Sequence, residues 1–167
     1  MEDPREAFEE TVKVVKEREV NLASITLASL IASLSELGIL TQGTVAALAK
    51  YFTPRICAYM KVKGVIDEGK PIEENMKRVF EEYAFKDGDY RFKASGNEVE
   101  IEIVTKRCKV CPKGVGGAEI PGTACPIPHF AATCLSILTG KSWKAKRVNK
   151  GTVEKEGGLC KMKLEVS

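Results

Sequence analysis

Histidine and tryptophan are nearly absent from this chain, and neither sign of charge dominates it. The 167 residues include one histidine, one tryptophan and a net charge of +3. No carboxylate is predicted near His129, the single histidine, so the sequence offers no Ser-His-Asp arrangement, and no pair of carboxylates stands out. A charge of +3 is too weak to indicate nucleic acid as a partner. The lysines in residues 141–167 have one aromatic residue among them, Trp143, and no repeated aromatic interleaving, which favours a solvated sheet face.

Long apolar runs are also missing. The most apolar stretch, "NLASITLASLIASLSELGIL" at residues 21–40, is interrupted by serine, threonine and Glu36. It is too short and too polar for a bilayer span, and it predicts a buried helix. The first ten residues, "MEDPREAFEE", are acidic and do not resemble a secretory signal. We therefore expect a cytoplasmic protein without a membrane span, in a compartment where cysteines serve metal or redox chemistry before disulfides.

Nucleotide-binding signatures are missing as well. The glycine-rich segment "KGVGG" at residues 113–117 lacks the lysine-serine pattern of a phosphate-binding loop. No strand before it and helix after it have the spacing of a dinucleotide site. The segment predicts a loop. The absence of these motifs favours a protein that is not an enzyme, and it leaves an enzymatic role open.

Residues 1–86 have mainly helical periodicity. Apolar residues at helical spacing predict helices over 4–18 and 22–37, and Gly38 suits the C-cap of the second. Residues 44–52 continue helically. Thr53-Pro54 then resembles an N-cap followed by a first-turn proline, which predicts a new or kinked helix to about Lys63. Pro71 opens a further helix.

Residues 87–167 change to a strand pattern. "YRFKAS" and "EVEIEIVTK" alternate apolar and polar residues around a Gly96-Asn97 turn, which predicts a hairpin. A helix over 130–139 ending at Gly140 and two more alternating strands, "WKAKRVN" and "LCKMKLEV", complete the pattern. The sequence therefore predicts a single α+β domain, with N-terminal helices packed on a largely antiparallel sheet.

Four cysteines suggest a metal site in this second half. Cys108 and Cys111 form a C-x-x-C pair, which lets two thiolates from one turn reach a single ion. Cys125 follows a glycine-rich segment that can fold back. Cys160 lies in the last strand, beside the 98–106 strand if the sheet pairs them. A four-thiolate zinc site from these cysteines would tie loop, hairpin and final strand together.

A second ligand set remains open. Cys108, Cys111, His129 and Cys134 approximate a zinc-finger spacing, so His129 or Cys134 is an alternative to one of the four. Against this set, prolines flank the histidine and Cys134 lies in an apolar helix, where buried structural thiols are common. An iron–sulfur or redox centre and uncoordinated thiols or disulfides are the other interpretations. Cys57 is expected to be a core cysteine.

From about Glu98 onward the chain resembles the 4-vinyl-reductase domain family, in its archaeal small-molecule-binding type. The resemblance rests on "RCKVC", "TACPIPHFAATCLSILTG", "WKAKRVN" and "EGGLCKMKLEV". It implies an α/β domain that encloses a small apolar molecule, forms a homodimer and carries zinc near the pocket. The family's cysteines before the short helix and in the last strand match Cys125 and Cys160. Its other two ligands would fall near Asn149 and Thr152, which cannot replace them, so Cys108 and Cys111 are expected to compensate.

The leading interpretation is a binding module for a small apolar, hydrocarbon-like ligand with a structural zinc site. The first alternative is a redox protein or reductase component using the C-x-x-C centre, with an iron–sulfur cluster in place of zinc. The second is a scaffold subunit. Because no DNA-binding or ATPase segment accompanies the domain, we expect any output to pass through a protein partner. Candidate pocket residues are Leu30, Leu34, Phe52, Met60 and Phe130, with the 111–128 loop as a gate.

Overall fold

The second half of the chain forms an antiparallel sheet. The computed structural model describes residues 4–120, 122–149 and 151–167, so residues 1–3, Pro121 in the predicted gate loop, and Lys150 lie outside it. Within the described residues the sheet has five strands in the order β1-β2-β5-β3, and β4 also pairs with β5. The strands are β1 (Tyr90–Ser95), β2 (Glu98–Val104), β3 (Trp143–Ala145), β4 (Glu154–Glu156) and β5 (Leu159–Val166).

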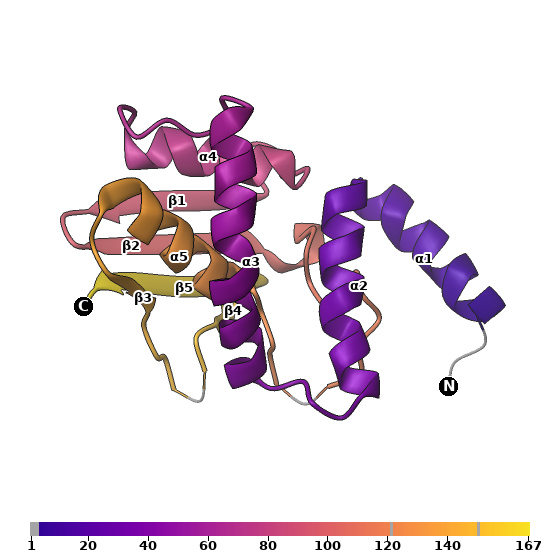
Figure 1. The fold of residues 1–167 in the computed structure, drawn as a ribbon. Coiled ribbons are helices and arrows are strands. Elements are labelled where there is room, and N and C mark those ends of the chain that lie inside the picture. The colour runs from indigo at the N-terminus through magenta and orange to yellow at the C-terminus, as the bar shows by residue number, and fades with distance from the viewer. Residues whose placement is uncertain (1–3, 121, 150) are drawn as a thin grey trace.

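Helices cover one face of this sheet (Figure 1). Helix α5 packs on β3 and β5, α3 packs on α5, and α4 packs on β1. Helix α2 stands beside this layer, and α1 lies outermost (Figure 1). The predicted α+β class, with helices on an antiparallel sheet, is confirmed. The bounds are α1 (Pro4–Arg18), α2 (Leu22–Glu36), α3 (Gln42–Val62), α4 (Ile72–Glu82) and α5 (Ile127–Thr139), with a 3-10 turn η1 (Thr105–Arg107).

Of the two alternatives predicted at Thr53-Pro54, a new helix or a kinked one, the new helix is wrong. Helix α3 runs unbroken from Gln42 to Val62 with Pro54 inside it, and its N-cap is Thr41, whose side chain accepts from the Thr44 amide. Proline removes one backbone donor but does not forbid a helix whose sides are packed. Helix α3 is packed along α5, and Thr53 is fully buried in that contact region.

Strand alternation places the core between the sheet and its helices. Ile103 and Met162 are buried in β2 and β5, on the face that meets α5. The β2–β5 register pairs Ile103 with Cys160, so the last strand does lie beside the strand predicted over 98–106. Side chains two residues apart share a face, and Cys160 therefore lies on the same face as Met162.

The opposite face of the sheet is charged. Lys163 pairs with Glu100 at 2.8 Å across β5 and β2, and Lys146 pairs with Glu165 at 3.4 Å. These cross-strand pairs neutralise the C-terminal lysines on their own face. The basic bias of residues 141–167 is therefore part of a solvated sheet face, as the sequence predicts.

Helix α2 rests on the cysteine loop, residues 108–125. A Cβ added at Gly116 would collide with the Ala28 carbonyl oxygen, so the loop backbone lies directly against α2. Ile31 of α2 packs with Val45 and Ala124 in a small apolar cluster. The N-terminal end of α2 is fixed to the end of α4, because Ser24 donates to the Tyr83 carbonyl at 2.6 Å. The loop thus supports the helical half as well as the sheet.

In the part of the chain that the structure describes, no helix is long and apolar enough to cross a membrane.

Candidate thiol site

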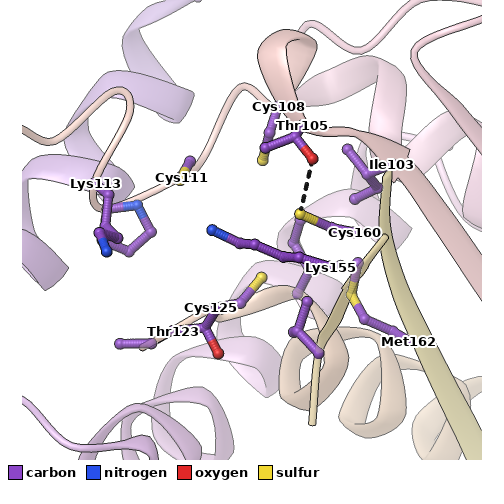
Figure 2. Close-up of a pocket in the computed structure, with 14 residues that line it drawn as sticks. Ile103, Thr105, Cys108, Cys111, Lys113, Thr123, Cys125, Lys155, Cys160 and Met162 are labelled. Atoms are coloured by element: carbon purple, nitrogen blue, oxygen red, sulfur yellow. Dashed lines mark hydrogen bonds between the residues drawn. The ribbon is translucent and has the colours of Figure 1, made fainter. Parts of the chain in front are cut away.

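The four predicted cysteines line one pocket. Cys108, Cys111, Cys125 and Cys160 line a cavity of about 40 Å³ between the cysteine loop and the end of β2 and start of β5. The volume admits a water-sized occupant. Figure 2 shows their side chains around this pocket, with Cys125 and Cys160 on other segments than the Cys108–Cys111 turn. The four cysteines that sequence spacing selects thus line one pocket, and their role as metal ligands stays a prediction.

Local folding explains where each sulfur lies. Cys108 follows η1, which begins directly after β2 and turns the chain away from the sheet. Cys111 begins a tight turn in which its carbonyl accepts from the Val115 amide at 2.8 Å. The Gly114 amide donates to the Cys111 sulfur at 3.4 Å. Cys125 precedes α5, and Cys160 faces the pocket from β5, where the Thr105 hydroxyl lies 3.4 Å from its sulfur.

The thiols of the C-x-x-C turn are electrostatically unequal. A hydrogen bond from Cys108, followed by the Gly114 and Lys113 amides and the Arg18 charge, lowers the pKa of Cys111 to about 5. The same hydrogen bond and burial raise the pKa of Cys108 well above its ordinary value. The pair therefore holds one thiolate and one thiol near neutral pH.

Burial is the largest cause of the pKa shift of Cys125. Burial, with smaller contributions from Cys111 and Cys160, raises the pKa of Cys125 to about 12. Lys155 acts in the opposite direction. Figure 2 shows the Lys155 side chain extending across the pocket between Cys111 and Cys125. The four cysteine sulfurs that line the pocket are a donor set suited to binding a soft cation once Lys155 moves aside.

The side chains as placed do not yet form a closed coordination sphere. Among residues 4–120, 122–149 and 151–167, no three His, Cys, Asp or Glu side chains are grouped closely enough to hold a metal ion. The donor set nevertheless fits zinc in kind and number, since a structural site takes four thiolates at about 2.3 Å. The four sulfurs that line this pocket would have to draw together around the ion.

The two alternative ligands lie elsewhere. His129 is not among the residues that line the thiol pocket, and its Nε2 lies 2.7 Å from the Gln42 amide nitrogen. That amide nitrogen also lies 3.2 Å from the Thr152 hydroxyl oxygen. Cys134 is fully buried in α5, with its sulfur 3.0 Å from that of Cys57 in α3. His129 thus links α3 to the start of α5, and Cys134 belongs to the helix–helix core.

The candidate pocket residues mostly face a groove between α2 and α3. Leu30, Phe52 and Met60 line this groove, whose volume is about 660 Å³. Phe130 stacks on Phe52 with ring centroids 6.2 Å apart and lines a small adjoining cavity. Leu34 is half-buried further along α2 and is not among the lining residues. The groove therefore collects three of the five predicted residues, between two helices.

Sequence reasoning missed Lys155 and Arg18. Lys155 lies in β4, a strand of three exposed charged residues that gives no alternation signal. Arg18 ends α1 and donates to the Cys108 carbonyl at 3.0 Å, a contact between residues 90 positions apart. A single lysine or arginine in a sequence does not indicate a site, because charged residues are common on any protein surface.

Comparisons with known proteins give a family but no activity. An uncharacterized protein, MJ1342, from Methanocaldococcus jannaschii is 41% identical over 70 residues, which cover 41% of this chain and 61% of the relative. The match thus spans less than two thirds of that relative's length. No solved structure matches the chain significantly. A family model matches residues 38–166, which include the cysteine loop and the whole sheet, and the chain therefore belongs to the MJ0207 family.

Proposed function

We propose that this chain is a small-molecule-binding module of the 4-vinyl-reductase type, with a structural zinc ion held by Cys108, Cys111, Cys125 and Cys160. The observation that carries the proposal is that these four cysteines, drawn from separate segments, line a single pocket. The other two thiols, Cys57 and Cys134, lie together elsewhere.

The position of the pocket supports a structural role for the metal. Cys108 lies at the end of the β2–η1 segment, Cys125 before α5 and Cys160 on β5. Zinc would supply a cross-link among these segments. Between η1 and α5 the described residues of the cysteine loop form no helix or strand, yet α2 rests on this loop at Gly116. A loop of this kind needs a fixed anchor if it is to hold a helix in place.

The test is elemental analysis of the full chain purified anaerobically, with two matched cysteine variants. We expect about one zinc ion per chain in the unmodified protein and in Cys134→Ala, and none in Cys160→Ala. Cys160→Ala should also unfold at a lower temperature than Cys134→Ala. The first substitution removes the metal cross-link, whereas the second leaves only a small cavity. Equal metal content in both variants, or no metal in the unmodified protein, would overturn the zinc proposal.

The groove between α2 and α3 supports the ligand-binding part of the proposal. It is lined mainly by apolar side chains, with Glu82 at one end. Its wall residues Leu30 and Tyr59 are 64% and 60% exposed, which is costly for large apolar groups unless something covers them. A volume of about 660 Å³ lies within the range of small-molecule sites. An apolar, chain-like or ring-containing ligand matches this lining.

A redox role is the second candidate, favoured by the position of Cys108 and Cys111, which are three residues apart and line the same pocket. Two thiols of one C-x-x-C turn that approach each other can close to a disulfide, passing two electrons and two protons to an acceptor disulfide. The test is titration of the metal-free chain against glutathione buffers, followed by mass mapping of the cysteines. A Cys108–Cys111 bond that forms reversibly would favour this role, and bound zinc that blocks it would favour the first.

The resemblance also predicts a homodimer, and apolar side chains outside the groove support that proposal. Leu37, Tyr51 and Val62 are 68%, 72% and 85% exposed on the helical half. Light scattering after gel filtration measures the mass directly. A monomer at every concentration tested would contradict self-association and leave the ligand proposal standing, because these three residues do not line the groove.

A further inference from the structure

A pair of buried cysteines joins α3 and α5 away from the thiol pocket. Cys57 and Cys134 are 1% and 0% exposed, and their sulfurs are 3.0 Å apart. Helices α3 and α5 make the most extensive helix–helix contact in the described chain, so the two backbones are held in register around the pair. Neither cysteine lines the pocket of the other four. The pair is therefore separate from the proposed zinc site.

We propose that Cys57 and Cys134 form a disulfide that cross-links α3 to α5. A disulfide bond is about 2.05 Å long, so the two sulfurs need to approach by about 1 Å. Rotation of two cysteine side chains can supply a movement of that size with little change in the helices. The cross-link would join residues 77 positions apart.

An oxidant can reach this pair from the surface. Cys57 lines a cavity of about 280 Å³ at the outer edge of the α3–α5 contact, together with Pro54, Ile66 and Ile137. Cys134 lies behind it and is not among the lining residues. The hydrogen bond with Cys134 lowers the pKa of Cys57, so the more accessible sulfur is also the more readily ionised.

The oxidant that we assign is a peroxide. The Cys57 thiolate attacks one peroxide oxygen, the O–O bond breaks, and a sulfenic acid and water result once a proton is taken up. The Cys134 thiol then attacks the Cys57 sulfur, an S–S bond forms, and a second water leaves. In total, two thiols and one hydrogen peroxide give one disulfide and two waters, with sulfur oxidised and peroxide oxygen reduced.

The test is differential cysteine labelling of the full chain before and after hydrogen peroxide treatment. Free thiols are blocked in denaturant, disulfides are then reduced, and the released thiols receive a second label that peptide mapping locates. We expect the second label on Cys57 and Cys134, and an unreduced digest in which their peptides are joined. First label on both cysteines after oxidation, or a peptide from either joined to another cysteine, would overturn the proposal.

Thermal unfolding gives a second readout. Closing a long loop should raise the melting temperature of the oxidised protein over the reduced protein by roughly 4 to 16 °C. Cys57→Ala should abolish that difference. If this variant fails to fold, the mapping of the unmodified chain still decides the question. Zinc content is independent of this pair, so failure of one proposal leaves the other intact.

Discussion

The guanidinium group of Arg18, at the end of α1, donates to the carbonyl oxygen of Cys108 at 3.0 Å. It also reaches the Thr105 carbonyl at 3.4 Å. A Cβ at Gly114 would lie 2.6 Å from the same guanidinium, so the side chain fills the space inside the cysteine loop. The outermost helix is thus attached to the turn that carries the first two cysteines.

We expect Arg18→Ala to lower the free energy of unfolding by about 1 to 2 kcal/mol, because it removes charge-assisted hydrogen bonds to two carbonyls. Lys16→Ala, at an exposed position of the same helix, is the matched control and should change stability by less than about 0.5 kcal/mol. Urea unfolding measures both. Equal effects from the two substitutions would show that the Arg18 contacts carry no net stabilisation.

Two glycine-to-alanine substitutions distinguish the effect of close packing on stability from the effect of backbone conformational freedom. Gly116→Ala places a methyl group against the Ala28 carbonyl and 2.7 Å from that of Pro112, so the loop and α2 must separate. We expect a loss of about 1 to 3 kcal/mol. Gly43→Ala, near the start of α3, meets only Thr41 at 3.6 Å and should gain about 0.4 to 1 kcal/mol. A neutral Gly116→Ala in urea unfolding would contradict the close contact between loop and helix.

The titration of His129 should make the free energy of unfolding depend on pH. The effect can be assigned to this residue because the chain has one histidine. Burial, followed by the charge of Lys50, lowers the pKa of His129 below its ordinary value of 6.5. The folded state then binds fewer protons than the unfolded state below pH 6.5. Stability should therefore fall as the pH drops from 6.5 to the folded pKa.

NMR titration of the His129 ring should give a pKa below 6.5, and Lys50→Met should move it upward. His129→Gln should remove this part of the pH dependence of urea unfolding. A ring pKa at or above 6.5 would mean that the imidazole gains more from Gln42 or solvent than it loses by burial.

The α2–α3 groove can be tested with an environment-sensitive apolar dye. Leu30→Lys puts a charge into the groove, and Leu37→Lys puts the same charge on α2's end, outside the lining residues. Both positions are similarly exposed, at 64% and 68%, so neither change should unfold the chain. We expect Leu30→Lys to weaken dye binding roughly tenfold, about 1.4 kcal/mol, and Leu37→Lys to leave it unchanged. Equal binding by the two variants would place the dye elsewhere.

The sheet could be predicted well because its signal lies in local alternation. The turn at Gly96-Asn97 and the alternating residues on either side define the β1–β2 hairpin. The last strand has the same pattern, and its pairing with β2 sets Cys160 beside the first hairpin. Strand β4 was missed because all three of its residues are charged and exposed, so nothing distinguishes it from a loop.

Helix continuity at Pro54 depended on tertiary packing. The pair Thr53-Pro54 has the local chemistry of a helix start, but Thr53 is fully buried within α3. The packing of α3 along α5 holds the helix through the proline, and that contact cannot be seen in a local window of sequence.

The cysteine set was predictable from spacing, whereas the groove was not. The four cysteines of the pocket are the ones that the C-x-x-C pattern and its distance to later cysteines suggest. Neighbouring apolar residues of α2 cannot be assigned in that way. Ile31 is 2% exposed and Leu30 is 64% exposed, and the difference depends on which helix face meets the loop. The Cys57–Cys134 contact likewise depends on how α3 and α5 pack.

The pairing of Cys160 with Ile103 ties the thiol pocket to the hydrophobic core. Met162 and Leu164 follow Cys160 at two-residue intervals, and both are buried. A one-residue insertion at the Gly157-Gly158 turn that shifted β5 would send all three side chains to the charged face. Homologues with a different loop at this turn must keep the same β2–β5 register to keep these side chains in the core. The same register keeps residue 160 facing the pocket.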